Sequence, residues 1–296
     1  MKANNQVIFN NYQNEINECL LRITADKPQL QKAVCEAMEY SLSAGGKRLR
    51  PMLVLEFCRI CGGDYKKYVE IACCIELVHT FSLIHDDLPC MDNDDFRRGR
   101  PSCHKVYPES IALLAGDALN TLPFEIITNK ALDGTISFET AVKLVNVLSS
   151  AIGVNGMIGG QVIDIEAENR KISLDELNVL QSLKTGALIK ASCVMGCLLA
   201  GREDLIPYAE KYAENVGRAF QIVDDILDVE GSFEELGKPI GSDKESEKST
   251  YVSILGLDES KRISKVLTDD ALKVVENFDN NDFLKDVTEY LLVRKN

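Results

Sequence analysis

The sequence predicts an all-α protein, built as a single large helical bundle around a deep central cavity. Long segments carry apolar residues at three- and four-residue spacing, which is the period of an amphipathic helix, and alternating apolar–polar runs are few. No linker rich in proline or serine divides the chain, so residues 1–296 are expected to form one domain. Hydrophobic residues make up 45% of the chain, which is enough for a large core.

Glycine and proline residues set the ends of the expected helices in the first third of the chain. Gly45-Gly46 follows one apolar pattern, Gly62-Gly63 follows the next, and Pro89 ends a third. The segment before Pro89 is apolar almost all round, which is typical of a helix buried at the centre of a domain. The expected helices here are 11–22, 29–43, 51–61 and 66–88.

The same spacing continues through the rest of the chain, with one interruption. It predicts helices over 110–130, 137–154, 174–199, 206–229, 261–278 and 281–293. Between residues 234 and 250, Gly237, Pro239 and Gly241 stand among serines and charged residues. That composition predicts a mobile loop, suited to closing over a site.

The net negative charge of the chain limits the kinds of molecule that it is expected to bind. The net charge of −13 argues against nucleic acid, because no basic surplus exists to neutralise phosphates, and it argues against docking on anionic lipid. The most apolar run, 71–84, contains Glu76 and His79, so it is expected to be too short and too polar to span a membrane. We therefore expect no stable membrane insertion.

The ten cysteines are expected to be reduced thiols in the cytoplasm, because the N-terminal residues lack the apolar core of a signal peptide. Cys58 and Cys61 form a CxxC, but no second CxxC accompanies it, which argues against a zinc site. Four further cysteines have apolar neighbours and are expected in the core: Cys73, Cys74, Cys193 and Cys197.

Two aspartate clusters, each at the end of an apolar segment, dominate the sequence. The first contains Asp86, Asp87 and Asp92, and the second contains Asp224, Asp225 and Asp228. Crowded carboxylates repel one another and are costly to desolvate, so a cation is the usual remedy. Oxygen ligands favour a hard cation, Mg²⁺ or Ca²⁺. The clusters therefore predict two walls of one metal site, with an anionic ligand between them.

The two clusters differ in their expected geometry. Asp224 and Asp228 are four residues apart, so they share a helix face with Gln221. Asp86 and Asp92 are six apart, and we expect the chain to bend before Pro89 and return Asp92 to Asp86. Taken alone, the second cluster could also be a solvated acidic helix end. An EF-hand Ca²⁺-binding loop beginning at Asp92 is excluded, because its sixth position is Arg97 and not glycine.

Cationic residues near the acids indicate a polyphosphate ligand, because Mg²⁺ bridges phosphates to carboxylates and arginine forks bind the remaining oxygens. Each of them alone could equally be a solvated surface charge, and His79 could be a core histidine. The candidates are Lys47, Arg48, Arg50, His79, Arg97, Arg98, Lys184, Lys238 and Lys248.

Together these residues resemble the trans-isoprenyl diphosphate synthases of the polyprenyl synthetase family, over nearly the whole chain. Five segments carry the resemblance in order: 45–51, 85–99, 159–164, 184–186 and 220–228. The resemblance implies the all-α isoprenoid synthase fold, with the two aspartate motifs facing each other across the cavity. It implies head-to-tail condensation of an allylic diphosphate with isopentenyl diphosphate, and a homodimer.

The resemblance also implies a role for each site residue. Three Mg²⁺ ions would be bound by Asp86, Asp92 and Asp224, supported by Asp87, Asp164, Asp225 and Asp228. The allylic diphosphate would be held by Arg97, Lys184, Lys238 and Lys248, and isopentenyl diphosphate by Lys47, Arg50, His79 and Arg98. The allylic carbocation would face the carbonyls of Lys184 and Thr185 and the side chain of Gln221.

Phe81 bears on the length of the product. It lies five residues before Asp86, and in the family an aromatic residue there is associated with fifteen-carbon products. The resemblance therefore implies farnesyl diphosphate, made from dimethylallyl and geranyl diphosphates; Phe81 as plain core and a longer geranylgeranyl product stay open. The rival classes are a class I terpene cyclase, a non-catalytic partner subunit and, more distantly, a Ca²⁺-binding acidic protein.

Overall fold

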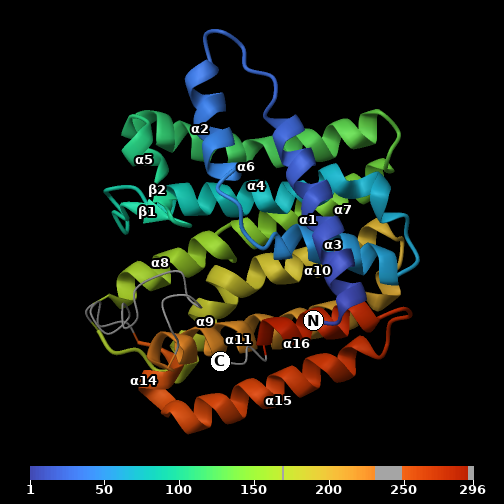
Figure 1. Cartoon of the computed structure of the whole chain (residues 1–296), viewed down its shortest axis with the longest axis vertical. Coiled ribbons are helices and arrows are strands. Elements are labelled where there is room, and N and C mark those ends of the chain that lie inside the picture. Colours follow the sequence, from blue (N-terminus) through green and yellow to red (C-terminus); the bar gives the residue numbers. More distant parts are fainter. Residues whose placement is uncertain (169, 231–248, 293–296) are drawn as a thin grey trace.

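The chain folds as a stack of helices, seen in a computed structural model that describes residues 1–168, 170–230 and 249–292 (Figure 1). The first half contains α1 Ala3–Ile23, α2 Lys32–Leu42, α3 Leu49–Ile60, the 3₁₀ turn η1 Tyr65–Tyr68, α4 Val69–Asp86, β1 Phe96–Arg97, β2 Arg100–Pro101, α5 Cys103–Val106 and α6 Glu109–Leu132. The second half contains α7 Phe138–Ile152, α8 Met157–Ala167, α9 Leu174–Gln181, the π-turn η2 Ser182–Gly186, α10 Ala187–Leu199, η3 Glu203–Leu205, α11 Ile206–Glu230, α14 Tyr251–Leu255, α15 Leu257–Val275 and α16 Asp282–Leu292.

The all-α prediction is confirmed. Within the described ranges the only strands are β1 and β2, which form a short antiparallel hairpin pairing Phe96 with Pro101. From top to bottom of Figure 1 the stack runs α6, α4, then α3 with α10, then α11, then α15, and each layer packs on the next. The C-terminal ends of α4 and α11, which carry the two aspartate motifs, lie on the same side of the molecule.

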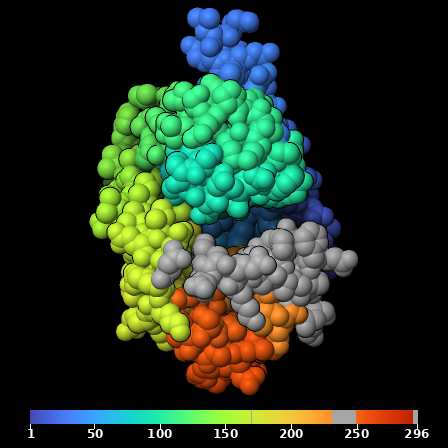
Figure 2. Space-filling view, turned by 90° about the vertical axis from the view of Figure 1, so that its left-hand side faces the viewer, coloured from blue at the N-terminus to red at the C-terminus, as the bar shows by residue number. Residues whose placement is uncertain are grey.

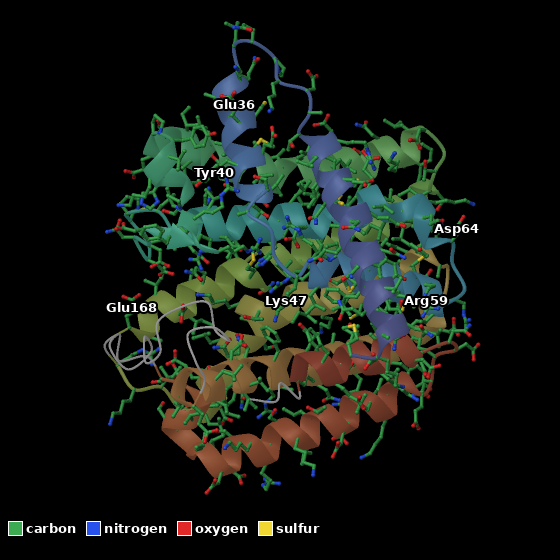
Figure 3. All side chains as sticks on the ribbon, viewed as in Figure 1. Glu36, Tyr40, Lys47, Arg59, Asp64 and Glu168 are labelled. Atoms are coloured by element: carbon green, nitrogen blue, oxygen red, sulfur yellow. The ribbon has the colours of Figure 1, made fainter. Side chains whose placement is uncertain are left out.

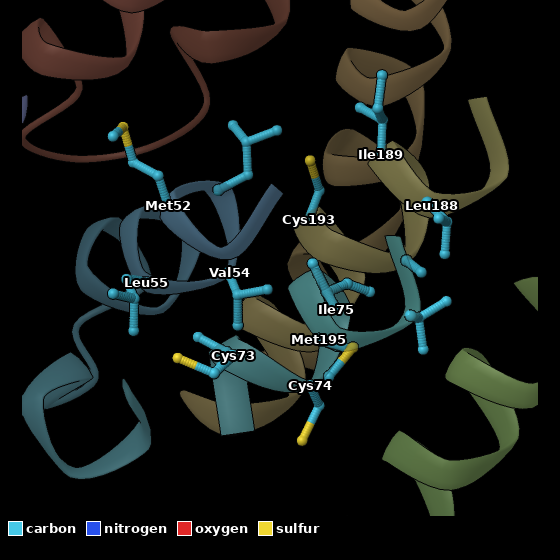
Figure 4. Close-up of a cluster of buried hydrophobic side chains, with 14 of the residues drawn as sticks. Met52, Val54, Leu55, Cys73, Cys74, Ile75, Leu188, Ile189, Cys193 and Met195 are labelled. Atoms are coloured by element: carbon cyan, nitrogen blue, oxygen red, sulfur yellow. The ribbon is translucent and has the colours of Figure 1, made fainter. Parts of the chain in front are cut away.

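Helix α4 is the central element, as its uniformly apolar sequence predicts. It packs against α1, α3, α6 and α10, and its residues Cys73, Cys74 and Ile75 are fully buried. Figure 4 shows where α3, α4 and α10 meet, with Val54, Ile75 and Cys193 among the buried side chains that the three helices contribute. One cluster of buried apolar residues runs from Phe9 in α1 to Leu292 in α16.

Two expected helices differ from the observed ones, and one observed helix was not expected. The first begins at Ala3 and not at residue 11, and the expected helix 174–199 is interrupted by the π-turn η2. Helix α8 was not expected, because Gly159-Gly160 breaks the helical pattern in the sequence. Most of the expected loop 234–250 lies outside the described residues; Thr250 within it caps α14, accepting a hydrogen bond from the Ser253 backbone.

The ten cysteines are all free thiols, and the four expected in the core are buried. Cys197 lies with its Sγ 3.7 Å from that of Cys61, within the packing of α10 on α3. The cysteines of this core therefore act as small apolar residues.

Four described segments are long and apolar enough to cross a membrane by length and composition: Tyr65–Asp86, Glu109–Leu132, Phe138–Ala167 and Leu174–Leu199. From the sequence, only residues 71–84 were considered as a possible membrane span, so the other three segments were not recognised. In the segments of α4 and α10, 61% of the apolar window is buried inside the protein, which accounts for their apolar sequence. In the segments of α6 and of α7–α8 the buried shares are 39% and 33%, so much of their apolar surface faces outward.

Candidate active site

The first aspartate motif turns back on itself, as the sequence predicts. Helix α4 ends at Asp86, and the backbone N–H of Asp92 donates to the Asp86 carbonyl over 2.9 Å. Asn93 follows with a φ of 52°, in the left-handed region that asparagine tolerates better than most residues. The bend before Pro89 thus brings the last acid of the motif beside the first.

The side chain of Asp86 is in an environment that disfavours its charge. The pKa of Asp86 is raised to about 6: burial is the largest cause, the negative charges of Asp92 and Asp87 add to it, and the cations Lys184 and Arg97 oppose it. An ionised carboxylate in such a place gains from a nearby cation.

Asp87 is directed to a different partner. Its side chain is 3% exposed and accepts hydrogen bonds from Nε (2.9 Å) and Nη2 of Arg97. Arg97 also donates from Nη2 to Asp94 over 3.0 Å. Burial raises the pKa of Asp87 and the bond to Arg97 lowers it. In this arrangement Asp87 orients Arg97, whereas the resemblance implied a supporting role at the metals.

The second motif lines a cavity of about 270 Å³ between α8, the π-turn and α11. Six of the predicted site residues line it: Asp164, Lys184, Thr185, Gln221, Asp224 and Asp225. Asp228, one turn beyond Asp224, is only 3% exposed. Because six residues expected on sequence grounds border one cavity, the structure brings this half of the predicted site together.

Two polar contacts order the wall formed by the π-turn. Lys184 donates to Asp164 of α8 over 2.6 Å, and the Thr185 hydroxyl donates to Oε1 of Gln221 over 2.9 Å. On the opposite edge, the backbone N–H of Tyr251 donates to Asp225 over 2.7 Å. π-Turns recur at functional sites, and this one carries Lys184 and Thr185, two of the three residues expected to face the carbocation.

Lys184 links the two walls, because its charge acts on Asp86 while its ammonium group contacts Asp164. Figure 2, which looks onto this side of the molecule, shows the surface hollowed between the cyan-green residues of the first motif and the orange residues of α14 and α15. Within the described ranges no three histidine, cysteine or carboxylate side chains converge on one metal position. The oxygen-only donors on two walls nevertheless fit Mg²⁺, which binds through one or two carboxylates plus phosphate oxygens.

The basic segment 45–51 forms a third side of the site. Arg98 donates from Nη1 to the carbonyl of Gly45, which ties the hairpin to this segment. Within the segment, Arg50 is half-buried and Lys47 lies near the centre of the molecule in Figure 3. His79 of α4 is also half-buried. Burial lowers the pKa of His79 well below its ordinary value, and the charges of Arg50 and Arg98 lower it further. His79 is therefore a neutral hydrogen-bonding group.

Phe81 is 7% exposed and packs edge-on against His85, with ring centroids 5.1 Å apart. The His85 ring reaches the Leu113 carbonyl of α6, with Nε2 3.0 Å from the oxygen. It fits there because Gly116 has no side chain; a Cβ on Gly116 would meet Nε2 at 2.1 Å. Lys238 and Lys248, predicted to hold the allylic diphosphate, lie outside the described residues.

Sequence reasoning missed one residue of the site, Glu76, and the role of its partner Arg48. Glu76 of α4 is 2% exposed and forms an ion pair with Arg48, which the sequence presented only as one cation of a basic segment. The available signal was an acidic residue inside an otherwise apolar helix, since buried carboxylates are almost always paired.

Comparison with known proteins identifies the family. The polyprenyl synthetase family model matches residues 31–291. The chain belongs to the polyprenyl synthetase family. It is 46% identical to a farnesyl diphosphate synthase of Micrococcus luteus, over 95% of each chain. It is 42% identical to a farnesyl diphosphate synthase of Bacillus subtilis, over 93% of each.

Solved structures agree. An FPP/GFPP synthase from Zymomonas mobilis is 33% identical with a TM-score of 0.87, covering 99% of this chain and 100% of that one. A geranylgeranyl pyrophosphate synthetase from Pyrococcus horikoshii is 27% identical with a TM-score of 0.88, covering 98% and 99%. The predicted family, fold and activity are confirmed, and the longer-product alternative is no better supported than the farnesyl product.

Gly160 should be essential for the shape of the site. A Cβ at Gly160 would lie 2.3 Å from the Lys184 backbone nitrogen, so Gly160→Ala must push α8 away from the π-turn. We expect a loss of turnover of about a hundredfold, because small displacements of positioning groups have effects of that size. Gly186→Ala is the matched control, since its Cβ meets nothing closer than 3.5 Å. Steady-state kinetics with circular dichroism as a folding check would measure both; equal activity in the two variants contradicts the assignment.

Asp86→Asn should stabilise the metal-free protein while removing activity. Because the pKa of Asp86 is raised to about 6 in the folded state, its charge opposes folding above pH 6, and this penalty disappears as the pH falls toward 4. The variant should gain about 2–3 kcal/mol at pH 8 and almost nothing at pH 4. Thermal unfolding in EDTA at both pH values measures this, with the exposed Asp269→Asn as control. An equal gain at both pH values would contradict the burial argument.

Proposed function

We propose that this chain condenses isopentenyl diphosphate with dimethylallyl and then geranyl diphosphate to form farnesyl diphosphate, in a reaction that requires Mg²⁺. The observation that carries the proposal is the meeting of two carboxylate walls with two separate groups of cations. Lys184 and Arg97 lie with the acids, whereas Arg50 belongs to the segment 45–51 and Arg98 is bonded to that segment, with the neutral His79 nearby. Two groups of cations suit two diphosphates.

The metal-binding residues would be Asp86 and Asp92 on one wall and Asp224 on the other, with three ions expected. Bound Mg²⁺ would neutralise the allylic diphosphate and so make it a better leaving group. Asp164 holds Lys184 through a 2.6 Å contact, and Asp87 holds Arg97, so both cations are positioned before substrate arrives. Pre-positioned cations stabilise a developing negative charge without reorganisation.

The π-turn would serve the other product of ionisation, the allylic carbocation. The Thr185 hydroxyl holds the Gln221 side chain, and the Lys184 and Thr185 carbonyls belong to the same turn. Their oxygen dipoles would stabilise positive charge in a site that excludes water. The double bond of isopentenyl diphosphate then attacks the cation, and the released diphosphate accepts the proton lost from the adduct. His79 is neutral and serves as a ligand to diphosphate.

Product length would be limited at Phe81. Five residues along α4 from Asp86 correspond to about 7–8 Å, so a ring at this depth stops a growing chain early. The packing of Phe81 on His85, itself seated on Gly116, keeps the ring from moving aside easily.

We further propose a homodimer in the cytoplasm, without stable insertion in a membrane. Apolar side chains left exposed on α6, α7 and α8 suit a second copy: Leu114 (52%), Val142 (69%) and Val162 (49%) are among them. The ten free thiols fit a reducing compartment. Sedimentation of the purified protein measures the mass directly, and a monomer at micromolar concentration would contradict the dimer.

The function is tested by incubating the purified protein with isopentenyl diphosphate, Mg²⁺ and each allylic diphosphate in turn, then identifying the products. We expect farnesyl diphosphate, no product in EDTA, and a loss of several orders of magnitude in Asp224→Ala. Release of a hydrocarbon from farnesyl diphosphate alone would favour a terpene cyclase. Absence of Mg²⁺-dependent diphosphate release would favour a non-catalytic subunit.

Phe81→Ala should lengthen the product to twenty carbons or more, because it removes the ring that we propose limits the growing chain. Phe9→Ala is the matched control: Phe9 is also 7% exposed but packs on Tyr290, in the contact of α1 with α16. Chromatography of the dephosphorylated products distinguishes the chain lengths. If Phe81→Ala still yields fifteen carbons, Phe81 is an ordinary core residue.

A further inference from the structure

Glu76 is a buried carboxylate that the proposed chemistry does not use. It lies in the middle of α4, is 2% exposed, and precedes Asp86 by ten residues, or about 15 Å along the helix. It is therefore outside the aspartate motif. An ionised group at such depth persists only where protein cations compensate it.

Arg48 is the first of these cations. Its Nη1 donates to Oε1 of Glu76 over 2.6 Å, its Nε donates to Asn17 over 2.9 Å, and its Nη2 donates to the Leu42 carbonyl. Arg48 has a φ of 52°, a left-handed conformation that costs energy in a residue with a side chain. Its side chain is 2% exposed and points inward, while its neighbour Lys47 is exposed. The ion pair thus compensates a backbone turn at the start of α3.

Arg98 is the second cation. Its Nη2 lies 3.9 Å from the same Oε1 of Glu76, and its Nη1 donates to the Gly45 carbonyl. The guanidinium fits only because Gly46 has no side chain; a Cβ there would meet Cζ at 2.8 Å. One carboxylate oxygen therefore attracts an arginine of the basic segment and an arginine of the β1–β2 hairpin, which are 50 residues apart in sequence.

Repulsion among cations explains why the carboxylate is needed. Arg48, Arg50 and Arg98 all act on His79, one turn beyond Glu76 on α4, and Glu76 acts on Arg50 as well. Three guanidinium groups near one half-buried imidazole repel one another strongly where water is excluded. Glu76 supplies a negative charge that interacts with all three of these arginines.

We propose that Glu76 is a positioning residue for the homoallylic diphosphate. Through Arg48 it sets the turn from which Lys47 and Arg50 extend, and through Arg98 it draws the hairpin arginine to the same subsite. Its ion-pair partners, Arg48 and Arg98, are different residues from Lys184 and Arg97, the cations that lie with the acids. The inference rests on the proposed function, because it assumes that these arginines bind isopentenyl diphosphate.

The test compares Glu76→Gln with Glu56→Gln. Glu56, in α3, is an equally buried glutamate that is 1% exposed. Its carboxylate accepts hydrogen bonds from Arg59 of the same helix and from Tyr12 of α1. Figure 3 shows Arg59 well away from Lys47. With each substrate varied in turn, Glu76→Gln should raise the KM for isopentenyl diphosphate at least tenfold and leave the KM for geranyl diphosphate within twofold. Glu56→Gln should lower the melting temperature and change neither KM.

Several results would overturn the proposal. If Glu76→Gln folds and both KM values rise together, or neither changes, Glu76 has only a structural role. A fall in the KM for isopentenyl diphosphate would mean that the charge of Glu76 weakens binding at this subsite. If Glu76→Gln does not fold, Glu76→Asp keeps the charge but withdraws it from Arg98, and should raise that KM about threefold; an unchanged KM rejects the inference. Condensation by the unmodified enzyme is measured alongside, so failure of the proposed function is seen separately.

Discussion

The contact between Lys184 and Asp164 joins the parts of this protein on which its chemistry depends. It fastens the π-turn to α8 over 2.6 Å, and the same ammonium group acts on Asp86 across the cavity. The contact exists only because Gly160 lets the backbones of α8 and the π-turn approach closely. Thr185, one residue on, is thereby presented to Gln221 of α11. The ammonium group of Lys184 thus interacts with residues of α8 and α4, and the turn that carries it contacts α11, so both aspartate motifs are connected through it.

Charge in this fold is balanced in pairs before any ligand arrives. Asp87 holds Arg97, Asp164 holds Lys184, and Glu76 holds Arg48. In the first two pairs the carboxylate orients a cation that would face the substrate. In the third pair Glu76 orients Arg48, whose neighbour in the chain, Lys47, would face it. At Asp86, burial and the charges of Asp92 and Asp87 outweigh the nearby cations, so its pKa is raised to about 6. That imbalance is the physical basis for expecting a bound cation.

The apolar helices have two different reasons for their composition. Helix α4 is apolar because other helices surround it, whereas much of the apolar surface of α6, α7 and α8 faces outward. Hydrophobic periodicity cannot separate these cases, because it records how apolar a helix is and not what covers it. A second subunit is the covering that we propose for the outward faces.

The all-α class, the central place of α4, the bend that returns Asp92 to Asp86, and the family could all be predicted from the amino-acid sequence. These follow from local patterns: helical spacing, a proline, and motifs of adjacent residues. Three features became visible in the folded chain alone: Gly159-Gly160 lies inside a helix, a π-turn interrupts the helix carrying Lys184, and Glu76 lies between Arg48 and Arg98. Each of these depends on contacts between residues far apart in the chain, where close packing and paired charges outweigh local propensity.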